Sequence, residues 1–181
     1  MYIAEQLKKK SVAEYLLYMW QVEDTLRAYG LDAEKMAMEY IPQFGLDEAK
    51  SETLKGWYES LIQMMREEGV TERGHLQVNK NIIILLTDLH AQLLKSSKHP
   101  FYSAAYYKAL PFIVELRAKS VDSQEKNEIE NCFDALYGTM LLRAQKKEVS
   151  AETATAMDNI AKFIGMLSEY YKKDKAGEVE F

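Results

Sequence analysis

The chain has 181 residues, of which 48% are hydrophobic and 28% charged, and its formal net charge is -5. This composition is typical of a globular protein and excludes an intrinsically disordered chain. The acidic balance argues against nucleic acid as a partner, because nucleic-acid-binding surfaces normally carry a basic patch. Cys132 is the only cysteine and no long uncharged apolar run occurs, so we expect no intrachain disulfide, no membrane-spanning segment and a cytoplasmic location.

Capping residues and helically spaced apolar residues predict seven successive helices. They are expected at residues 11–29, 32–41, 47–69, 71–97, 99–119, from Asp122 or Ser123 to 147, and 150–172. The expected N-caps include Ser11, Asp32, Asp47, Thr71 and Ser150, and Pro100 is expected at a first helical position. The apolar run 81–87 could form a buried strand by periodicity alone, but its flanks continue the helical pattern and no second strand exists to pair with it.

These elements predict an all-α fold, a single-domain antiparallel helical bundle of about seven helices. No internal repeat or flexible linker divides the chain, and short connections favour antiparallel neighbours. We expect the domain to cover residues 1–172, with the helices of 11–29, 71–97, 99–119 and 122–147 at its centre. Residues 173–181 are expected to form a flexible C-terminal tail anchored only by Phe181.

Glu23 lies where the first predicted helix should be apolar. It falls within the stripe of Val12, Leu16, Met19 and Leu26. A buried carboxylate is costly unless it is paired, and Arg27, four residues later, could provide the partner. Glu23 is therefore interpreted as one member of an intrahelical ion pair, as an acid in a pocket, or as a contact with another molecule.

The predicted helix 71–97 also carries polar residues on its apolar stripe. That stripe consists of Val78, Ile82, Leu86, Leu89 and Leu93, with His75 and Asn79 on it and His90 at its margin. We expect His75 and Asn79 to hydrogen-bond to facing groups such as Glu23 or Arg27, in a network that sets the register of the two helices.

A metal site at this helix is not expected, although Glu72 and His75 have the Glu-x-x-His spacing of metal sites in helical bundles. Such a site needs a second Glu-x-x-His element, which the chain lacks. His75 and His90 would lie roughly 22 Å apart on one helix, too far to share an ion.

The predicted helix 99–119 contains an internal proline, Pro111. Proline leaves the carbonyl of Tyr107 without its helical donor, which favours a kink or a pocket at that point. The inner face is expected to consist of Phe101, Ala105, Ala109, Phe112 and Leu116, with Lys108 at its edge.

Motifs for catalysis and for cofactor binding are absent. The chain has no Gly-rich phosphate loop, no Gly-x-Ser-x-Gly and no Cys-x-x-Cys, so neither a catalytic residue nor a cofactor is predicted, although an enzyme is not excluded. Cys132 shares an apolar stripe with Ile129 and Leu136, which predicts a buried and inert thiol.

Three segments, "AEYLLYMWQVEDTLRA", "GHLQVNKNIIILLTDLH" and "FYSAAYYKALPFIVELRAKS", together resemble a family of helical proteins of about 180 residues from Bacteroidetes bacteria. The resemblance extends over nearly the whole chain. It implies a bacterial, cytoplasmic protein containing a domain of unknown function, and it implies no catalytic residue, cofactor or substrate.

Two hypotheses of function follow from the residues. The first is a non-enzymatic interaction or scaffold protein, oligomeric with itself or bound to a protein partner, that uses a tyrosine-bearing helix face; the chain has 12 tyrosines. The alternative is a small-molecule-binding protein or enzyme with a polar pocket around Glu23, Arg27, His75 and Asn79. The full set of candidate ligand-binding or network residues is Glu23, Arg27, His75, Asn79, His90, Lys108 and Tyr107.

Overall fold

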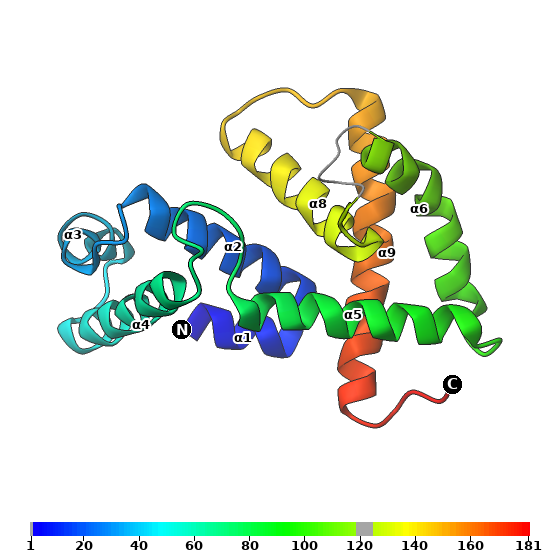
Figure 1. Cartoon of the computed structure of the whole chain (residues 1–181), viewed down its shortest axis with the longest axis horizontal. Helices are drawn as coiled ribbons and strands as arrows, with labels where there is room; N and C mark the ends of the chain where they lie inside the picture. Colours follow the sequence, from blue (N-terminus) through cyan, green and yellow to red (C-terminus); the bar gives the residue numbers. More distant parts are fainter. Residues whose placement is uncertain (1, 119–124) are drawn as a thin grey trace.

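The computed structural model describes residues 2–118 and 125–181, and the regular elements in them are all helices (Figure 1). The helices are α1 (Tyr2–Lys10), α2 (Val12–Ala28), α3 (Ala33–Glu39), the 3-10 helix η1 (Ile41–Phe44), α4 (Glu48–Glu67), α5 (Gln77–Lys95), α6 (Pro100–Ala118), α8 (Glu128–Ala144) and α9 (Ala151–Lys175). The predicted all-α class is confirmed, and the ambiguous run 81–87 is helical.

Side-chain caps begin four of the helices as predicted. Each of these cap side chains accepts a hydrogen bond from the backbone N–H three residues later. The four residues are Ser11, Asp32, Asp47 and Ser150. Pro100 is the first residue of α6, where its missing N–H leaves no helical bond unmade.

Some predicted boundaries are wrong. Helix α1 was not predicted, although its last turn carries Lys8, Lys9 and Lys10, which suit the negative end of a helix. Helix α5 begins at Gln77 rather than Thr71, because Gly74 has a φ of +87°, outside the helical region. The expected end at Lys119 and the start at Asp122 or Ser123 lie outside the described residues.

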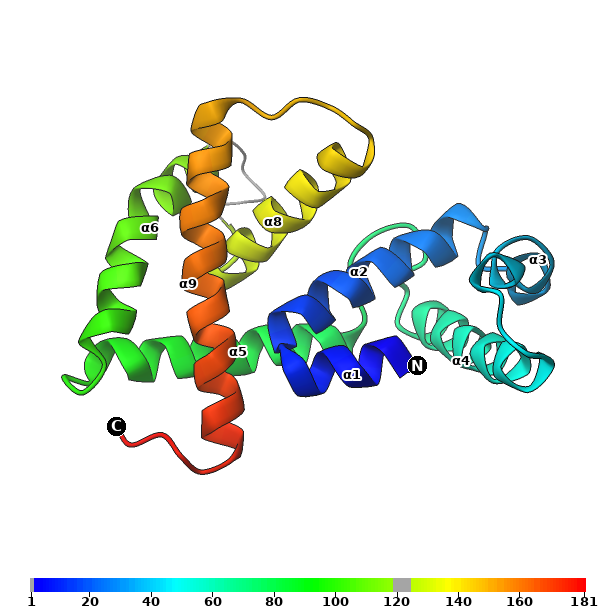
Figure 2. The same ribbon diagram turned by 180° about the vertical axis from the view of Figure 1, so that it is seen from behind.

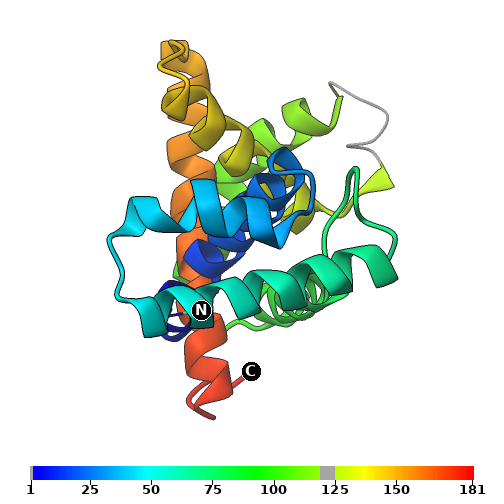
Figure 3. The same ribbon diagram turned by 90° about the vertical axis from the view of Figure 1, so that its left-hand side faces the viewer.

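Helix α9 lies at the centre of the arrangement, packed against α2, α5, α6 and α8. Figures 1 and 2 show it passing between α6 and α8 and crossing α5. The helices expected at the centre do pack together, because α8 contacts α2, α5 and α6, and α9 is a further central helix that contacts all four. Helix α1 packs against α2, and α3 and η1 pack against α4; Figure 3 shows α3 and α4 lying across the near end of the molecule.

The buried apolar side chains of the described residues form one continuous cluster. Its largest fully buried members are Trp20, Tyr102, Phe133 and Phe163. Cys132 is fully buried, as predicted. None of the described helices is long and apolar enough to cross a membrane.

Two predicted apolar faces differ from the observed ones. Val78 is 45% exposed, whereas the inner face of α5 runs from Asn79 through Ile82 and later residues. Phe101 is 83% exposed, because the inner face of α6 is shifted by one residue. That face consists of Tyr102, Tyr106, Ala109 and Ile113. Large apolar side chains stand next to each other in this segment, so both the predicted and the observed face are apolar. Contacts with the other helices determine which face is buried.

The C-terminal end contacts His99, the residue before α6. Helix α9 continues three residues past the predicted end at 172, to Lys175. The His99 Nε2 atom lies 2.9 Å from the backbone oxygen of Glu180, and the His99 and Phe181 rings meet edge to face. The predicted flexibility of residues 173–181 stays a prediction.

Candidate functional site

A fully buried carboxylate, that of Glu23 on α2, connects α2 to the beginning of α5. Its Oε1 atom accepts hydrogen bonds from the backbone N–H of Leu76, at 3.1 Å, and from the side-chain amide of Asn79, at 2.7 Å. Its Oε2 atom lies 2.6 Å from Nδ1 of His75. The three donors replace the water that the carboxylate loses on burial.

The position of Glu23 at the start of α5 adds to its stabilisation. The first N–H groups of a helix have no partner within the helix and carry partial positive charge. Leu76, the N-cap of α5, provides no side-chain cap, and its N–H is satisfied by Glu23 instead. The N–H of Gln77 donates to the carboxylate of Glu68 at 2.6 Å. Two glutamates from other segments therefore replace the expected cap at Thr71.

His75 is held on two sides. Its ring stacks on the indole of Trp20, with ring centroids 4.0 Å apart and planes inclined by 10°. Because Nδ1 contacts the carboxylate of Glu23, the imidazole cannot rotate without losing both contacts. The His75 side chain is nevertheless 22% exposed, and none of the described residues hydrogen-bonds to Nε2. The Nδ1 edge of the imidazole is therefore fixed by Glu23, and the Nε2 edge is available for a hydrogen bond to a ligand.

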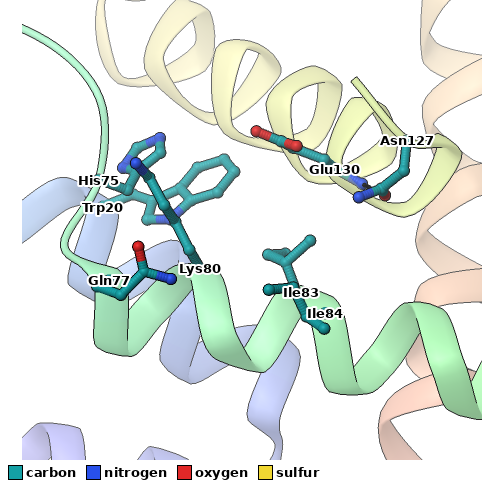
Figure 4. Close-up of a pocket in the computed structure, with 8 residues that line it drawn as sticks. All are labelled: Trp20, His75, Gln77, Lys80, Ile83, Ile84, Asn127 and Glu130. Atoms are coloured by element: carbon teal, nitrogen blue, oxygen red, sulfur yellow. Dashed lines mark hydrogen bonds between the residues drawn. The ribbon is translucent and has the colours of Figure 1, made fainter. Parts of the chain in front are cut away.

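A cleft of about 200 Å³ lies beside His75 and Trp20, bounded by the beginnings of α5 and α8 (Figure 4). The other residues that line it are Gln77, Lys80, Ile83, Ile84, Asn127 and Glu130. The indole nitrogen of Trp20 is buried and has no hydrogen-bond partner among the described residues. Tryptophan N–H groups normally find a partner when buried, so this donor is an anomaly at the wall of the cleft.

Arg27 does not pair with Glu23, contrary to one of the interpretations. Its Nη1 atom donates to Asp24 Oδ1 at 2.7 Å, and its Nη2 atom donates to the backbone carbonyls of Val70, at 3.0 Å, and Gly74. The guanidinium therefore holds the two ends of the turn that precedes His75. The other oxygen of Asp24 accepts a hydrogen bond from Tyr137 on α8 at 2.7 Å.

His90 belongs to a different cluster, between α5, α6 and α9. Its Nδ1 atom lies 2.6 Å from the hydroxyl of Tyr102, and its ring meets those of Tyr106 and Phe163 edge to face. Burial lowers the pKa of His90, and the nearby carboxylate of Glu128 opposes this shift. Burial also raises the pKa of Tyr102, so its hydroxyl stays protonated.

The structure thus brings together Glu23, His75 and Asn79, and it places the other predicted site residues elsewhere. Tyr107 is 62% exposed and Lys108 is exposed, and neither lines the cleft. Residues 71–74 form bends rather than helix, so the Glu72–His75 spacing is not a helical one. Within residues 2–118 and 125–181, no group of three or more metal-ligating side chains could hold an ion.

Several residues of the site were missed by sequence reasoning. Asn127 caps α8, with its side chain accepting from the N–H of Glu130 at 2.8 Å, and the Asn-x-x-Glu pattern could have revealed it. Lys80 and Glu130 look like ordinary surface charges in the sequence. No local signal indicates that the two lie on facing walls of one cleft.

A family match covers residues 1–178 of the chain. The chain belongs to the family described as a domain of unknown function (DUF4924). The resemblance to such a family is confirmed, and the Bacteroidetes origin that it implied stays a prediction. No curated protein and no solved structure matches the chain.

Proposed function

We propose that the protein binds a small polar molecule in the cleft beside His75. The observation that supports this most strongly is an imidazole fixed at one nitrogen and unpartnered at the other, at the wall of a cleft. The pocket differs from the one expected from the sequence. Glu23 and Asn79 are fully buried and do not line the cleft. Of the four residues expected around the pocket, which also include Arg27, only His75 lines the cleft.

The Glu23 contact determines what His75 can offer to a ligand. An ionised carboxylate accepts hydrogen bonds only, so Nδ1 carries the hydrogen and a neutral ring has an acceptor at Nε2. The indole N–H of Trp20 provides a donor nearby. Because stacking and hydrogen bonding hold the imidazole before binding, little side-chain entropy is lost when a ligand arrives.

A fragment screen by two-dimensional NMR tests this proposal. We expect millimolar hits among small polar fragments that shift the indole N–H resonance of Trp20. Ile84 is exposed and lines the cleft, so Ile84→Trp should fill the cleft and abolish the shifts. Leu85 is exposed but lies outside the cleft, and Leu85→Trp serves as the matched control. Absence of hits, or hits unaffected by Ile84→Trp, would contradict the proposal.

A second candidate, self-association of an interaction or scaffold protein, is supported by an apolar groove of about 270 Å³ at the other end of the molecule. Its lining residues are Tyr2, Ile3, Tyr18, Phe44, Leu46, Lys50, Leu54 and Tyr58. Four of them, Tyr2, Ile3, Phe44 and Leu46, are exposed. Contiguous exposed apolar surface is typical of interaction sites. Tyr102 and Tyr106 on α6 are buried and add nothing to an exposed tyrosine-bearing face, whereas Tyr107 beside them is 62% exposed.

Light scattering coupled to size-exclusion chromatography tests this candidate. We expect a dimer whose dissociation is promoted by Leu46→Glu, because a charge in a buried apolar interface is costly. Met38 is exposed and outside the groove, so Met38→Glu is the control. A wild-type chain that stays monomeric at high concentration would contradict self-association.

The cytoplasmic location is proposed on the lone cysteine alone, and a cell fractionation experiment tests it.

A further inference from the structure

The two walls of the cleft carry opposite charges. Lys80, on α5, lines the cleft together with Trp20 and His75, whereas Glu130 lies on α8, on the opposite side (Figure 4). Neither side chain forms an ion pair with another described residue. The cleft thus has a cationic side at Lys80 and an anionic side at Glu130. Each charge is free to interact with a bound molecule.

From this arrangement we propose that the ligand of the cleft is a small zwitterion of the α-amino acid type. This inference rests on the proposed function and names the class of molecule that the cleft would take. The ligand carboxylate would lie toward Lys80, with the indole N–H of Trp20 as a further donor. The ligand ammonium would lie toward the Glu130 carboxylate.

The remaining lining residues are compatible with such a molecule. Ile83 is buried and Ile84 is exposed, and together they provide an apolar wall for a ligand side chain. Asn127 and Gln77 add side-chain amides at the cleft. The cleft volume of about 200 Å³ is below the range of roughly 300–1,000 Å³ for drug-sized ligands, which favours a molecule of amino acid size.

Two charges of opposite sign discriminate strongly between ligands. A molecule with only one charge pairs with either Lys80 or Glu130 and lacks the hydrogen bond to the other, which stays in contact with solvent. A hydrogen bond to a charged group contributes enough that its loss weakens binding by about tenfold or more. The zwitterion should therefore bind at least tenfold more tightly than either matched analogue.

Titration with amino acids and matched analogues tests the inference. The proteinogenic amino acids are titrated against the full chain by NMR, following the Trp20 indole resonance. The tightest binder is then compared with the amine that lacks its carboxylate and with the acid that lacks its amine. For leucine these are 3-methylbutylamine and 4-methylpentanoate. We expect each analogue to bind about tenfold more weakly or worse.

Charge-removing variants assign each ligand group to a wall. Lys80→Met should remove the preference for the zwitterion over the amine, and Glu130→Gln should remove the preference over the acid. Lys95, on the last turn of the same helix, is the control as Lys95→Met. If fragments bind in the cleft but the amino acid binds no better than its analogues, the ligand class is wrong and the proposed function stands. If no fragment and no amino acid binds, both are wrong.

Discussion

At the scale of single residues, the central fact is that Glu23 has no contact with water and still has a donor on each of its oxygens. Removing a carboxylate from water costs several kcal/mol, and hydrogen bonds from His75, Leu76 and Asn79 offset that cost. The same bonds join segments more than 50 residues apart in the sequence, the sequence separation of Glu23 and His75 being 52. Glu23 therefore helps to fix the position of α5 as well as the orientation of the His75 ring.

The first prediction concerns Glu23→Gln. The amide keeps the volume but turns one acceptor into a donor that faces the donors of His75, Leu76 or Asn79. We expect the free energy of unfolding to fall by about 2–4 kcal/mol, measured by urea denaturation. Glu169 is exposed on α9, and Glu169→Gln should stay within about 0.5 kcal/mol of the wild type. Equal stability of the two variants would show that the Glu23 contacts contribute little.

The second prediction concerns the pH dependence that His90 confers. Burial among Tyr102, Tyr106 and Phe163 lowers its pKa in the folded state, whereas the unfolded chain has a histidine pKa of about 6.5. Below that pH the unfolded state binds more protons. The contribution of His90 is thus fully present above about pH 6.5 and is lost as the pH falls through the folded-state pKa.

Unfolding free energies measured between about pH 5 and 8 test this sign. The wild type should lose more stability toward low pH than His90→Gln, because glutamine does not titrate. The difference between the two curves isolates His90 from the carboxylates that both proteins share. A stability of the wild type relative to His90→Gln that is flat across this range, or that grows toward low pH, would contradict the lowered pKa.

At the scale of elements, the connection between α4 and α5 is fixed by side chains from α2. Gly69 ends α4 in a left-handed conformation, with a φ of +68°, and the N–H of Val70 reaches back to the carbonyl of Met65. Arg27 then holds the carbonyls at both ends of the following turn. Because α2 provides both Arg27 and Glu23, one helix positions the turn and the start of the next helix.

The third prediction tests this role with Arg27→Lys. A lysine has one nitrogen and cannot reach Asp24 and the carbonyls of Val70 and Gly74 in the geometry of the guanidinium. We expect a loss of about 1–2 kcal/mol and faster amide hydrogen exchange at Leu76 and in the turn. Arg73, exposed in the same turn, provides the control as Arg73→Lys. Unchanged exchange at Leu76 would show that the turn does not depend on Arg27.

The elements show what sequence patterns can and cannot predict. The caps Ser11, Asp47 and Ser150 act within one turn of their own helix, so local spacing predicts them. The start of α5 depends on Glu23 and Glu68 from other segments, and no local pattern reveals it. For the same reason sequence spacing suggested Arg27 as the partner of Glu23, whereas its actual acceptors lie 43 and 47 residues away as well as at Asp24.

At the scale of the whole molecule, α9 connects the packing of the other helices. Phe163 is fully buried, and its ring contacts those of His90, Tyr102 and Tyr106 at centroid distances of 5.4, 5.7 and 5.4 Å. At the other side of α9, the hydroxyl of Ser168 accepts from the N–H of Ala13 at 3.3 Å. The sequence predicts this helix but gives no sign that it is central, because every amphipathic helix shows a similar stripe.

The fourth prediction is that Phe163→Ala destabilises the entire fold. Removing a buried aromatic ring costs about 3–5 kcal/mol through lost burial and the cavity left behind. Urea denaturation should show a lower midpoint with an unchanged slope, as expected for one cooperative unit. Lys162→Ala, at an exposed neighbouring position, is the control. Two separate transitions in the variant would show that the helices unfold in parts.

The central place of α9 also bears on how the chain is made. A ribosome releases residues in order, so α2, α5, α6 and α8 emerge with their apolar faces uncovered, and the helix that covers them is synthesised after all four. Contacts such as Ser11 with Ser168, 157 residues apart, cannot form earlier. Nascent chains of this protein therefore expose apolar surface for most of translation. We expect chaperones to bind that surface, and we expect the chain to fold late and in one concerted step.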